Sequence, residues 1–197
     1  GRFNILLQGV RESSVEREVG ETSDRQAEVS WRGAPGAGLD TLRDEQVPRP
    51  LVLLGHSMGG AVAARLLAGG QRGDVDALVL SSPALDLGLS ALRRLRLAIG
   101  ARLSPNVAVH NGLSPLWISR DPQVVRNYVD DTRVHNRITP RLARFIVDAG
   151  REVIASAAQW RTPTLLLWSG ADRCVAPRGS AAFAAAAPKR AVQSRCF

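Results

Sequence analysis

A serine between two glycines is the feature of this sequence with the clearest chemistry. Ser57 lies in the pattern G-x-S-x-G, which follows the apolar run at residues 51–54 and leads directly into a segment rich in alanine and leucine. A short strand, this turn and a helix are typical of a nucleophile elbow, which exposes a serine hydroxyl above a parallel sheet. We expect a strained backbone at Ser57 and no room for a Cβ at Gly55 or Gly59.

The helix after the elbow would place free backbone N–H groups beside the serine. The N–H of Met58 is the expected oxyanion donor, because it points at the oxygen that becomes negative during acyl transfer and the helix dipole favours that charge. An ordinary strand-turn-helix corner with a buried serine is the alternative. Adjacent side chains on an elbow point apart, so we interpret the neighbouring His56 as a packing residue rather than as a catalytic one.

The sequence on either side of the serine predicts a βαβ unit. Apolar runs indicate strands at 51–56 and 75–80, and the segment between them indicates a helix at 58–69. Such a crossover is right-handed and makes the two strands parallel neighbours. The end of the second strand, Ser81-Ser82-Pro83, is therefore expected on the same rim of the sheet as Ser57.

Residues 84–161 are expected to form a helical insertion between strands. Prolines divide this part of the chain into short helices, expected at 89–103, 122–129 and 139–157. A third strand is expected at 164–169. Because the insertion interrupts the succession of strands, it is a natural position for a lid over a pocket.

A carboxylate follows the third predicted strand. Asp172 lies in a polar loop just beyond the carboxyl end of that strand, and the chain order serine, then aspartate suits an acid that orients a catalytic histidine. On position alone, a turn aspartate that caps the next helix, expected at 179–187, is an equal alternative. Asp86, which follows the second strand, is a weaker competitor for the role of triad acid.

Several segments between residues 50 and 188 share their pattern with one enzyme family. They are Gly55-His56-Ser57-Met58-Gly59-Gly60, Leu78-Val79-Leu80-Ser81-Ser82-Pro83, Ser119-Arg120-Asp121-Pro122, Tyr128, Val134-His135, Pro163-Thr164-Leu165-Leu166-Leu167 and Gly170-Ala171-Asp172. Together they resemble the α/β-hydrolases of the monoacylglycerol lipase, lysophospholipase and serine-aminopeptidase-like group. The resemblance implies that Ser57 is the nucleophile and Asp172 the acid of a catalytic triad.

The resemblance also implies a fold and its division along the chain. We expect an α/β-hydrolase fold with a mostly parallel sheet, helices on both faces and a helical lid. Residues 51–83 and 162–197 would form the core and residues 84–161 the lid or cap. Residues 1–50 match the family poorly. Within them Asn4-Ile5-Leu6-Leu7-Gln8-Gly9 is a candidate strand, with Gln8-Gly9 where the family has the His-Gly whose loop supplies a second oxyanion donor, so the sheet is expected to be incomplete at both ends.

The family's triad histidine lies on a loop after one further strand, downstream of Phe197. Of the three histidines in the chain, His110 and His135 fall in the predicted lid. We therefore expect no imidazole nitrogen within about 3.5 Å of the Ser57 hydroxyl in this chain. Without a base the hydroxyl is a poor nucleophile, so catalysis would be impaired. The alternative is that His110 or His135 reaches Ser57.

The formal net charge of +8 comes almost wholly from arginine, since Lys189 is the only lysine. The charge is spread along the chain, which argues against nucleic-acid binding. The one local cluster, Arg93-Arg94-Leu95-Arg96 with Arg102 beyond it, alternates with leucines. This pattern indicates a basic amphipathic helix that makes weak contact with an anionic membrane surface, or else a solvated arginine face.

No cofactor or metal is expected, because the sequence contains no dinucleotide fingerprint, phosphate loop or ligand cluster. Cys174 and Cys196 fit no metal spacing and are expected to be reduced thiols. The apolar runs are far shorter than the roughly 20 residues that span a bilayer, and no signal-peptide pattern opens the chain. These features favour a cytoplasmic protein; the oligomeric state stays open.

The expected activity is the hydrolysis of lipid-type carboxylic esters, monoacylglycerols or lysophospholipids, through an acyl-enzyme. Apolar side chains of the predicted lid suit an acyl chain if they line an entrance above the serine, although they could equally pack the lid helices together. These residues are Leu89, Leu92, Leu113, Trp117, Ile118 and Phe145. A peptidase, another α/β-hydrolase chemistry and a non-catalytic remnant are the alternative functions.

Overall fold

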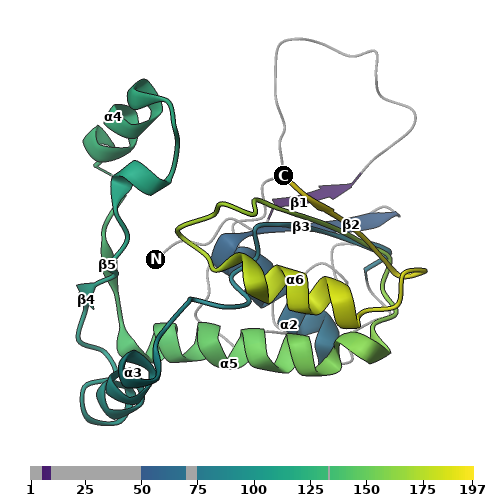
Figure 1. Ribbon diagram of the computed structural model, residues 1–197, viewed down its shortest axis with the longest axis horizontal. Coiled ribbons are helices and arrows are strands. Elements are labelled where there is room, and N and C mark those ends of the chain that lie inside the picture. Colours follow the sequence, from purple (N-terminus) through teal and green to yellow (C-terminus); the bar gives the residue numbers. More distant parts are fainter. Residues whose placement is uncertain (1–5, 10–49, 70–74, 133) are drawn as a thin grey trace.

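A five-stranded sheet in the order β1-β2-β3-β6-β7 forms the centre of the fold (Figure 1). The computed structural model describes residues 6–9, 50–69, 75–132 and 134–197. Strands β2, β3, β6 and β7 run parallel, and β1 pairs antiparallel with β2. The predicted mostly parallel sheet is therefore confirmed. The strands are β1 (Leu6–Gly9), β2 (Leu51–His56), β3 (Ala77–Ser81), β6 (Thr164–Trp168) and β7 (Val192–Cys196).

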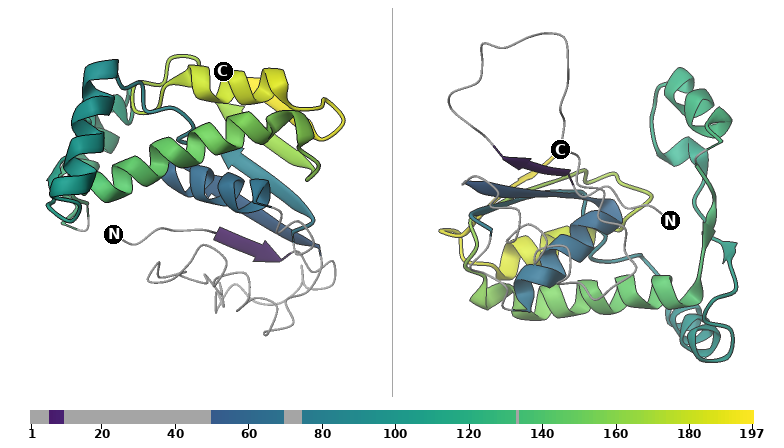
Figure 2. Two further views of the ribbon diagram at one scale, coloured as in Figure 1. Left: turned by 90° about the horizontal axis from the view of Figure 1, so that it is seen from below. Right: turned by 180° about the vertical axis from the view of Figure 1, so that it is seen from behind.

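Three helices pack against one face of the sheet. They are α2 (Ser57–Ala68), α5 (Pro140–Ser156) and α6 (Pro177–Ala186), which lie below the sheet in Figure 1 and in the rear view of Figure 2. Leu53, Leu80 and Leu166 of the strands are buried in one apolar cluster with residues of these helices. In the described ranges no helix covers the opposite face, where Leu165 is 40% exposed. Among the described residues, the expected helical cover is thus present on one of the two faces.

Small residues let the helices approach one another and the segment after β3. On α2 the side chains of Ala61, Ala63 and Ala64 are fully buried, so the helix backbone lies close to its neighbours. On α5 a Cβ at Gly150 would collide with the backbone of Leu85. This contact holds the chain that leaves β3 against the middle of α5.

Between β3 and α5 the chain leaves the layered core and returns, and we name residues 88–139 the excursion. It contains α3 (Ala91–Leu103), β4 (Val109–His110), η2 (Pro115–Trp117), α4 (Pro122–Asp130) and β5 (Arg137–Ile138). Figure 1 shows it projecting from one end of the core, with α4 at its tip. No helix in the described ranges has the length and apolar composition needed to cross a membrane.

The predicted lid range of 84–161 also includes a helix of the core layer. α5 packs along α2 and contributes the fully buried Val153 to the main apolar cluster. In the sequence α5 looks like one more of the short lid helices, because prolines divide this part of the chain. In the structure Pro140 occupies the first turn of α5, where proline is well tolerated. The part of the chain that stands away from the sheet is therefore shorter than the sequence suggests.

Two outer strands differ from the sequence-based expectation. The apolar pattern does not predict β7, because Gln193 and Arg195 interrupt it and only Val192 is buried. β1 runs antiparallel, so Gly9 pairs with Leu51 at the start of β2, the end remote from Ser57. The resemblance implied that Gln8-Gly9 lies beside the serine, and this expectation is wrong.

Candidate active site

The turn between β2 and α2 has the conformation of a nucleophile elbow. Ser57 has a φ of 52°, in the left-handed region that residues with a Cβ rarely adopt, whereas His56 before it is extended. This sharp reversal places Ser57 at the first position of α2 and at the carboxyl end of a strand that is paired on both sides. The expected strained serine between a parallel strand and a helix is present.

Close backbone contacts explain the glycines around Ser57. A Cβ at Gly55 would lie 2.7 Å from the Cα of Gly60 and 2.8 Å from the carbonyl oxygen of Gly59. A Cβ at Gly60 would lie 2.8 Å from the Cβ of Pro83. The expected lack of room is thus confirmed at Gly55, whereas at Gly59 it stays a prediction. Sequence reasoning missed the role of Gly60, although its position directly after the G-x-S-x-G pattern was a signal.

The end of β3 holds the elbow in place. His56 and Ser81 are register partners, so the two strands end on the same rim, as the βαβ unit predicts. The N–H of Ala84 donates to the carbonyl of Ser57 at 2.7 Å. Ser82 also has a positive φ, of 40°. Strained residues of this kind persist where surrounding contacts hold them, and they cluster at functional sites.

The first turn of α2 offers backbone donors next to the Ser57 hydroxyl. The first N–H groups of a helix have no partner within it, and the positive end of the helix dipole lies there. The N-cap residue His56 makes no side-chain capping bond, and the first turn carries no acidic residue. Met58, at the second position of α2, supplies one of these N–H groups, and its role as an oxyanion donor stays a prediction.

Asp172 lies beyond the carboxyl end of β6, on the same rim as Ser57. Because β3 separates β2 from β6, the two strand ends are about 10 Å apart. The Oδ1 atom of Asp172 accepts hydrogen bonds from the N–H groups of Cys174 and Val175 at 2.8 and 3.0 Å. In the described part of the chain Oδ2 accepts none. Asp172 does not cap α6, whose N-cap is Ala176.

The thiol of Cys174, two residues after Asp172, is unsuited to act as the nucleophile. Burial of the Cys174 side chain, together with the negative charge of Asp172, raises the pKa of the thiol. A thiol with a raised pKa is protonated at neutral pH and reacts slowly. Cys174 and Cys196 are both free thiols.

Asp86, the weaker competitor for the triad acid, is held in an ion pair. Its two carboxylate oxygens accept from Nε and Nη2 of Arg178 at 2.7 and 3.2 Å, and Oδ1 also accepts from the N–H of Gly88. Partial burial acts to raise the pKa of Asp86, but the hydrogen bonds from Arg178 and Gly88 and the charges of Arg178 and Arg94 outweigh it and lower that pKa. The carboxylate thus ties the start of the excursion to α6.

Asp86→Asn should lower the melting temperature at pH 7, and the melting temperature of the variant should fall less steeply as the solution is acidified. A carboxyl whose pKa is lowered in the folded state stabilises that state above the unfolded pKa, near 4, and this contribution disappears as the pH falls through the folded pKa. We expect a loss of roughly 2 °C at pH 7 and a smaller difference at pH 2. Thermal denaturation followed by circular dichroism measures both values.

The matched control for this prediction is Asp148→Asn. Asp148 pairs with Arg144 one turn away on α5, an exposed pair that stabilises a helix only weakly. If this variant and Asp86→Asn shift the melting temperature equally at both pH values, the Asp86–Arg178 pair has no special role in stability.

The three histidines of the chain all lie in the described ranges, and each contacts another group. His56 is exposed, with Nδ1 3.2 Å from the Ser81 hydroxyl, so our interpretation of it as a packing residue is wrong. The Nδ1 atom of His110 accepts from the N–H of Gly112, and that of His135 from the N–H of Arg137. None of them forms a hydrogen bond with Ser57 among the described contacts.

The apolar residues that were expected to line an entrance have different surroundings. Leu92 is exposed on α3. Phe145 joins a second apolar cluster with Met58, and the guanidinium of Arg65 lies over its ring at 4.8 Å. Trp117 lies under the guanidinium of Arg173 at 5.1 Å and thereby connects the excursion to the Asp172 loop. Among the described residues, no group of three His, Cys, Asp or Glu side chains could hold a metal ion.

The sequence is similar to one family of proteins over most of its length. The sequence model of the family described as serine aminopeptidase, S33, matches residues 36–197. A monoacylglycerol lipase from Mycolicibacterium smegmatis is 35% identical over 136 residues, which cover 66% of this chain and 47% of that protein. Phospholipase YtpA from Bacillus subtilis is 28% identical over 188 residues, 89% of this chain and 72% of the relative.

The fold agrees with a solved structure of the same group. The crystal structure of a monoacylglycerol lipase from Paleococcus ferrophilus superposes with a TM-score of 0.73 and 28% identity, covering 81% of this chain and 62% of the other. The chain thus spans about half the length of the Mycolicibacterium smegmatis relative and less than two thirds of the solved structure.

Proposed function

This chain belongs to the serine aminopeptidase S33 family of α/β-hydrolases, and we propose that it carries the catalytic core of a serine hydrolase acting on lipid-derived carboxylic esters. The observation that carries the proposal is the positive φ of Ser57 at the junction of a parallel strand and a helix. Asp172, on the same rim, is the proposed acid. The lipid substrate class is supported by relatives named monoacylglycerol lipase and phospholipase.

In the proposed reaction the Ser57 hydroxyl attacks the ester carbonyl carbon while a histidine takes its proton. The negative charge on the tetrahedral intermediate is stabilised by the N–H of Met58 and the N-terminus of α2. The imidazolium then protonates the departing alcohol, which leaves an acyl group on Ser57. Water, deprotonated by the same imidazole, attacks this acyl-enzyme and releases the fatty acid and the free serine.

The proposed base is the family's triad histidine on a loop after β7, and not His56, His110 or His135. The position of the end of β7 supports this proposal. The N–H of Gly170 donates to the carbonyl of Phe197 at 2.8 Å, and Phe197 donates to Trp168 at 2.9 Å. A loop that continues from Phe197 therefore starts beside the Asp172 loop, where Oδ2 could accept from an imidazole Nδ1–H.

A comparison of three substrates tests the proposed reaction. We expect a protein extended after Phe197 by the family's histidine loop to hydrolyse a monoacylglycerol or a short p-nitrophenyl ester faster than an aminoacyl amide, because the relatives it resembles are named as lipases. A lysophospholipid is the third substrate, and kcat/KM is the measured quantity. Faster turnover of the amide would assign the chain to peptide chemistry, and turnover of none of them would favour a non-catalytic remnant.

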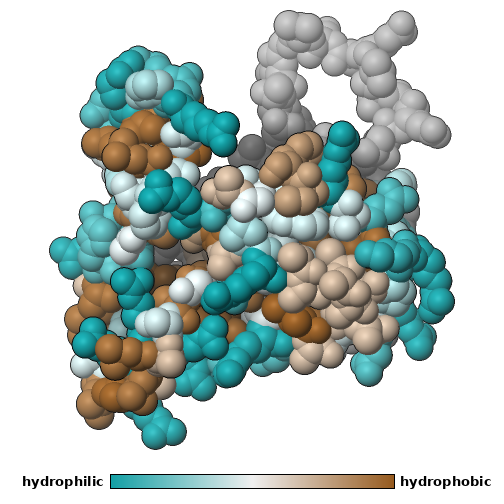
Figure 3. All heavy atoms as spheres, in the orientation of Figure 1, coloured by the Kyte–Doolittle hydropathy of each residue, from teal (hydrophilic) through white to brown (hydrophobic). Residues whose placement is uncertain are grey.

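We propose further that α3 makes the weak contact with an anionic lipid surface. One apolar stripe of α3, with Leu97, packs toward α5, and a second lies on the other side of the helix. The second stripe consists of Leu92, Leu95, Ile99 and Leu103, which are 48 to 79% exposed. Figure 3 shows apolar residues gathered over the lower left of the molecule, where α3 lies. Arg93, Arg96 and Arg102 flank this stripe in the sequence, a pattern that suits anionic lipid.

Sedimentation with vesicles tests this contact. We expect the chain to bind vesicles that contain phosphatidylglycerol and to bind pure phosphatidylcholine vesicles more weakly. The double variant Leu95→Ser with Ile99→Ser should reduce binding by about tenfold, because it removes two side chains from the lipid-facing stripe. The control is Val129→Ser on α4, also exposed but outside α3. Equal losses from both variants would contradict a specific role for α3.

A further inference from the structure

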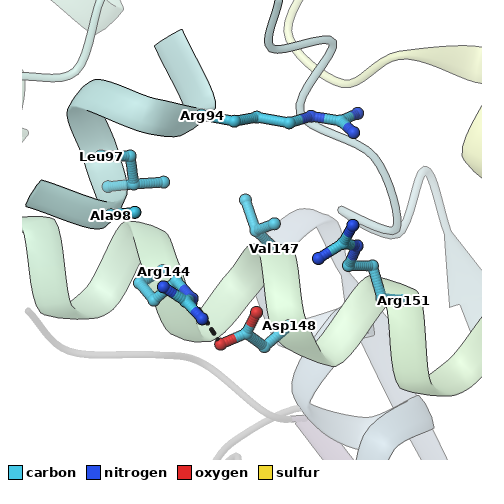
Figure 4. A pocket seen from close by; sticks show the side chains of 7 residues that line it. All are labelled: Arg94, Leu97, Ala98, Arg144, Val147, Asp148 and Arg151. Carbon is cyan, nitrogen blue, oxygen red and sulfur yellow. Dashed lines mark hydrogen bonds and ion pairs between the residues drawn. The ribbon is translucent and has the colours of Figure 1, made fainter. Parts of the chain in front are cut away.

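A pocket of about 240 Å³ lies where α3 of the excursion crosses α5 of the core (Figure 4). Neither Ser57 nor Asp172 contributes to it, so its role does not depend on the proposed hydrolysis. Its lining residues are Arg94, Leu97 and Ala98 from α3 and Arg144, Val147, Asp148 and Arg151 from α5.

The charges around this pocket are unbalanced. Arg144 donates to Asp148 at 2.7 Å, so these two charges neutralise each other. Arg94 and Arg151 make no ion pair with any residue of the described ranges. Figure 4 shows their guanidinium groups on the same side of the pocket, Arg94 reaching from α3 and Arg151 from α5, with Val147 beside them. Two guanidinium groups that form no ion pair therefore face one small volume, and the charge of Arg94 also acts on the nearby Asp86 carboxyl.

The geometry of the two guanidinium groups favours one class of anion as the ligand of this pocket. A guanidinium presents a planar set of N–H donors that matches two oxygens of a carboxylate or phosphate. Two such groups from different helices suit a tetrahedral phosphate better than a flat carboxylate, because its oxygens point in several directions. Leu97, Ala98 and Val147 form an apolar wall beside them, half-buried and able to contact hydrocarbon.

We infer that the pocket between α3 and α5 binds a phosphate group attached to an apolar body, through Arg94 and Arg151. The phosphate oxygens accept from both guanidinium groups, and the apolar part lies against Leu97 and Val147. Because one arginine belongs to the excursion and the other to the core, the bound phosphate ties the two together. A phospholipid-type ester and free inorganic phosphate share this chemistry, and the apolar wall favours the ester.

Isothermal titration calorimetry on the full chain, with two soluble probes, tests the inference. The probes are inorganic phosphate and 1-hexanoyl-glycerol 3-phosphate below its micellar concentration. We expect the hexanoyl ester to bind at least about tenfold more tightly, because its methylene groups leave water. Arg94→Gln and Arg151→Gln should each weaken its binding by about tenfold, since each removes a charge-assisted contact.

The control variants remove the same charge outside both the pocket and the lipid-facing stripe of α3. Arg126→Gln on α4 and Arg141→Gln on α5 should change the affinity less than twofold, and circular dichroism verifies that all four variants fold. Equal affinity for the two probes would identify free phosphate as the ligand and leave the two arginines as its site. Binding of neither probe, or equal losses from the control variants, would overturn the inference.

Discussion

Ser57→Ala should lower kcat for ester hydrolysis by about 10⁴-fold or more in the protein extended by the histidine loop. The elbow holds the hydroxyl at the N-terminus of α2. Alanine removes the atom that forms the acyl-enzyme while the backbone donors remain. Release of p-nitrophenol from a short ester measures the loss.

Two further variants separate chemistry from folding. Ser194→Ala removes an exposed hydroxyl on β7, far along the chain from the elbow, and should leave kcat unchanged. Ser57→Gly should be as inactive as Ser57→Ala, yet at least as stable as the original protein, because glycine adopts a φ of 52° without strain. Substantial hydrolysis by Ser57→Ala would remove this serine from the mechanism.

Asp172→Asn should lower kcat by about 10³- to 10⁴-fold with little change in KM. The proposed carboxylate holds the imidazole in one tautomer and stabilises the imidazolium, and an amide does neither. The substitution preserves the loop, because the amide oxygen can still accept from the N–H groups of Cys174 and Val175. The predicted signature is therefore a catalytic defect in a protein with a normal melting temperature.

Asp86→Asn is the matched control for the acid. Asp86 also follows a strand on the carboxyl rim, but Arg178 engages both of its oxygens. We expect this variant to lose stability while retaining most of its kcat, the reverse of the pattern at Asp172. If Asp86→Asn is the inactive variant and Asp172→Asn is active, the acid lies one strand earlier than proposed.

The same edge of the sheet contains both strained residues and the contacts that hold them. Ser57 and Ser82 have positive φ values, and backbone hydrogen bonds connect each of them to a neighbouring strand or loop. The N–H of Ser82 donates to the carbonyl of Leu167 at 2.8 Å, and that of Ala84 to Ser57. We therefore expect a substitution in the segment after β3 to change the position of Ser57 through these hydrogen bonds.

The elbow and the position of Asp172 were predictable from sequence because their signals are local. An apolar run, two glycines around a serine and an alanine-rich segment define a strand, a turn and a helix within about twenty residues of chain. The steric demand at Gly55 is part of the same short pattern, since its contacts are with Gly59 and Gly60. The resemblance to a known family then supplied the roles that spacing alone left open.

Only the tertiary structure decided which distant segments meet. It placed α5 in the core rather than in the lid, paired Asp86 with Arg178 across 92 positions of sequence, and exposed His56. It also brought Arg94 and Arg151 to one pocket, although each belongs to a different helix. Periodicity and turn residues report on neighbours within one element, whereas such contacts depend on how the elements pack. A charged residue therefore looks the same in the sequence whether the fold exposes it to solvent or places it in an ion pair. A proline likewise does not show whether the helix that it begins is buried.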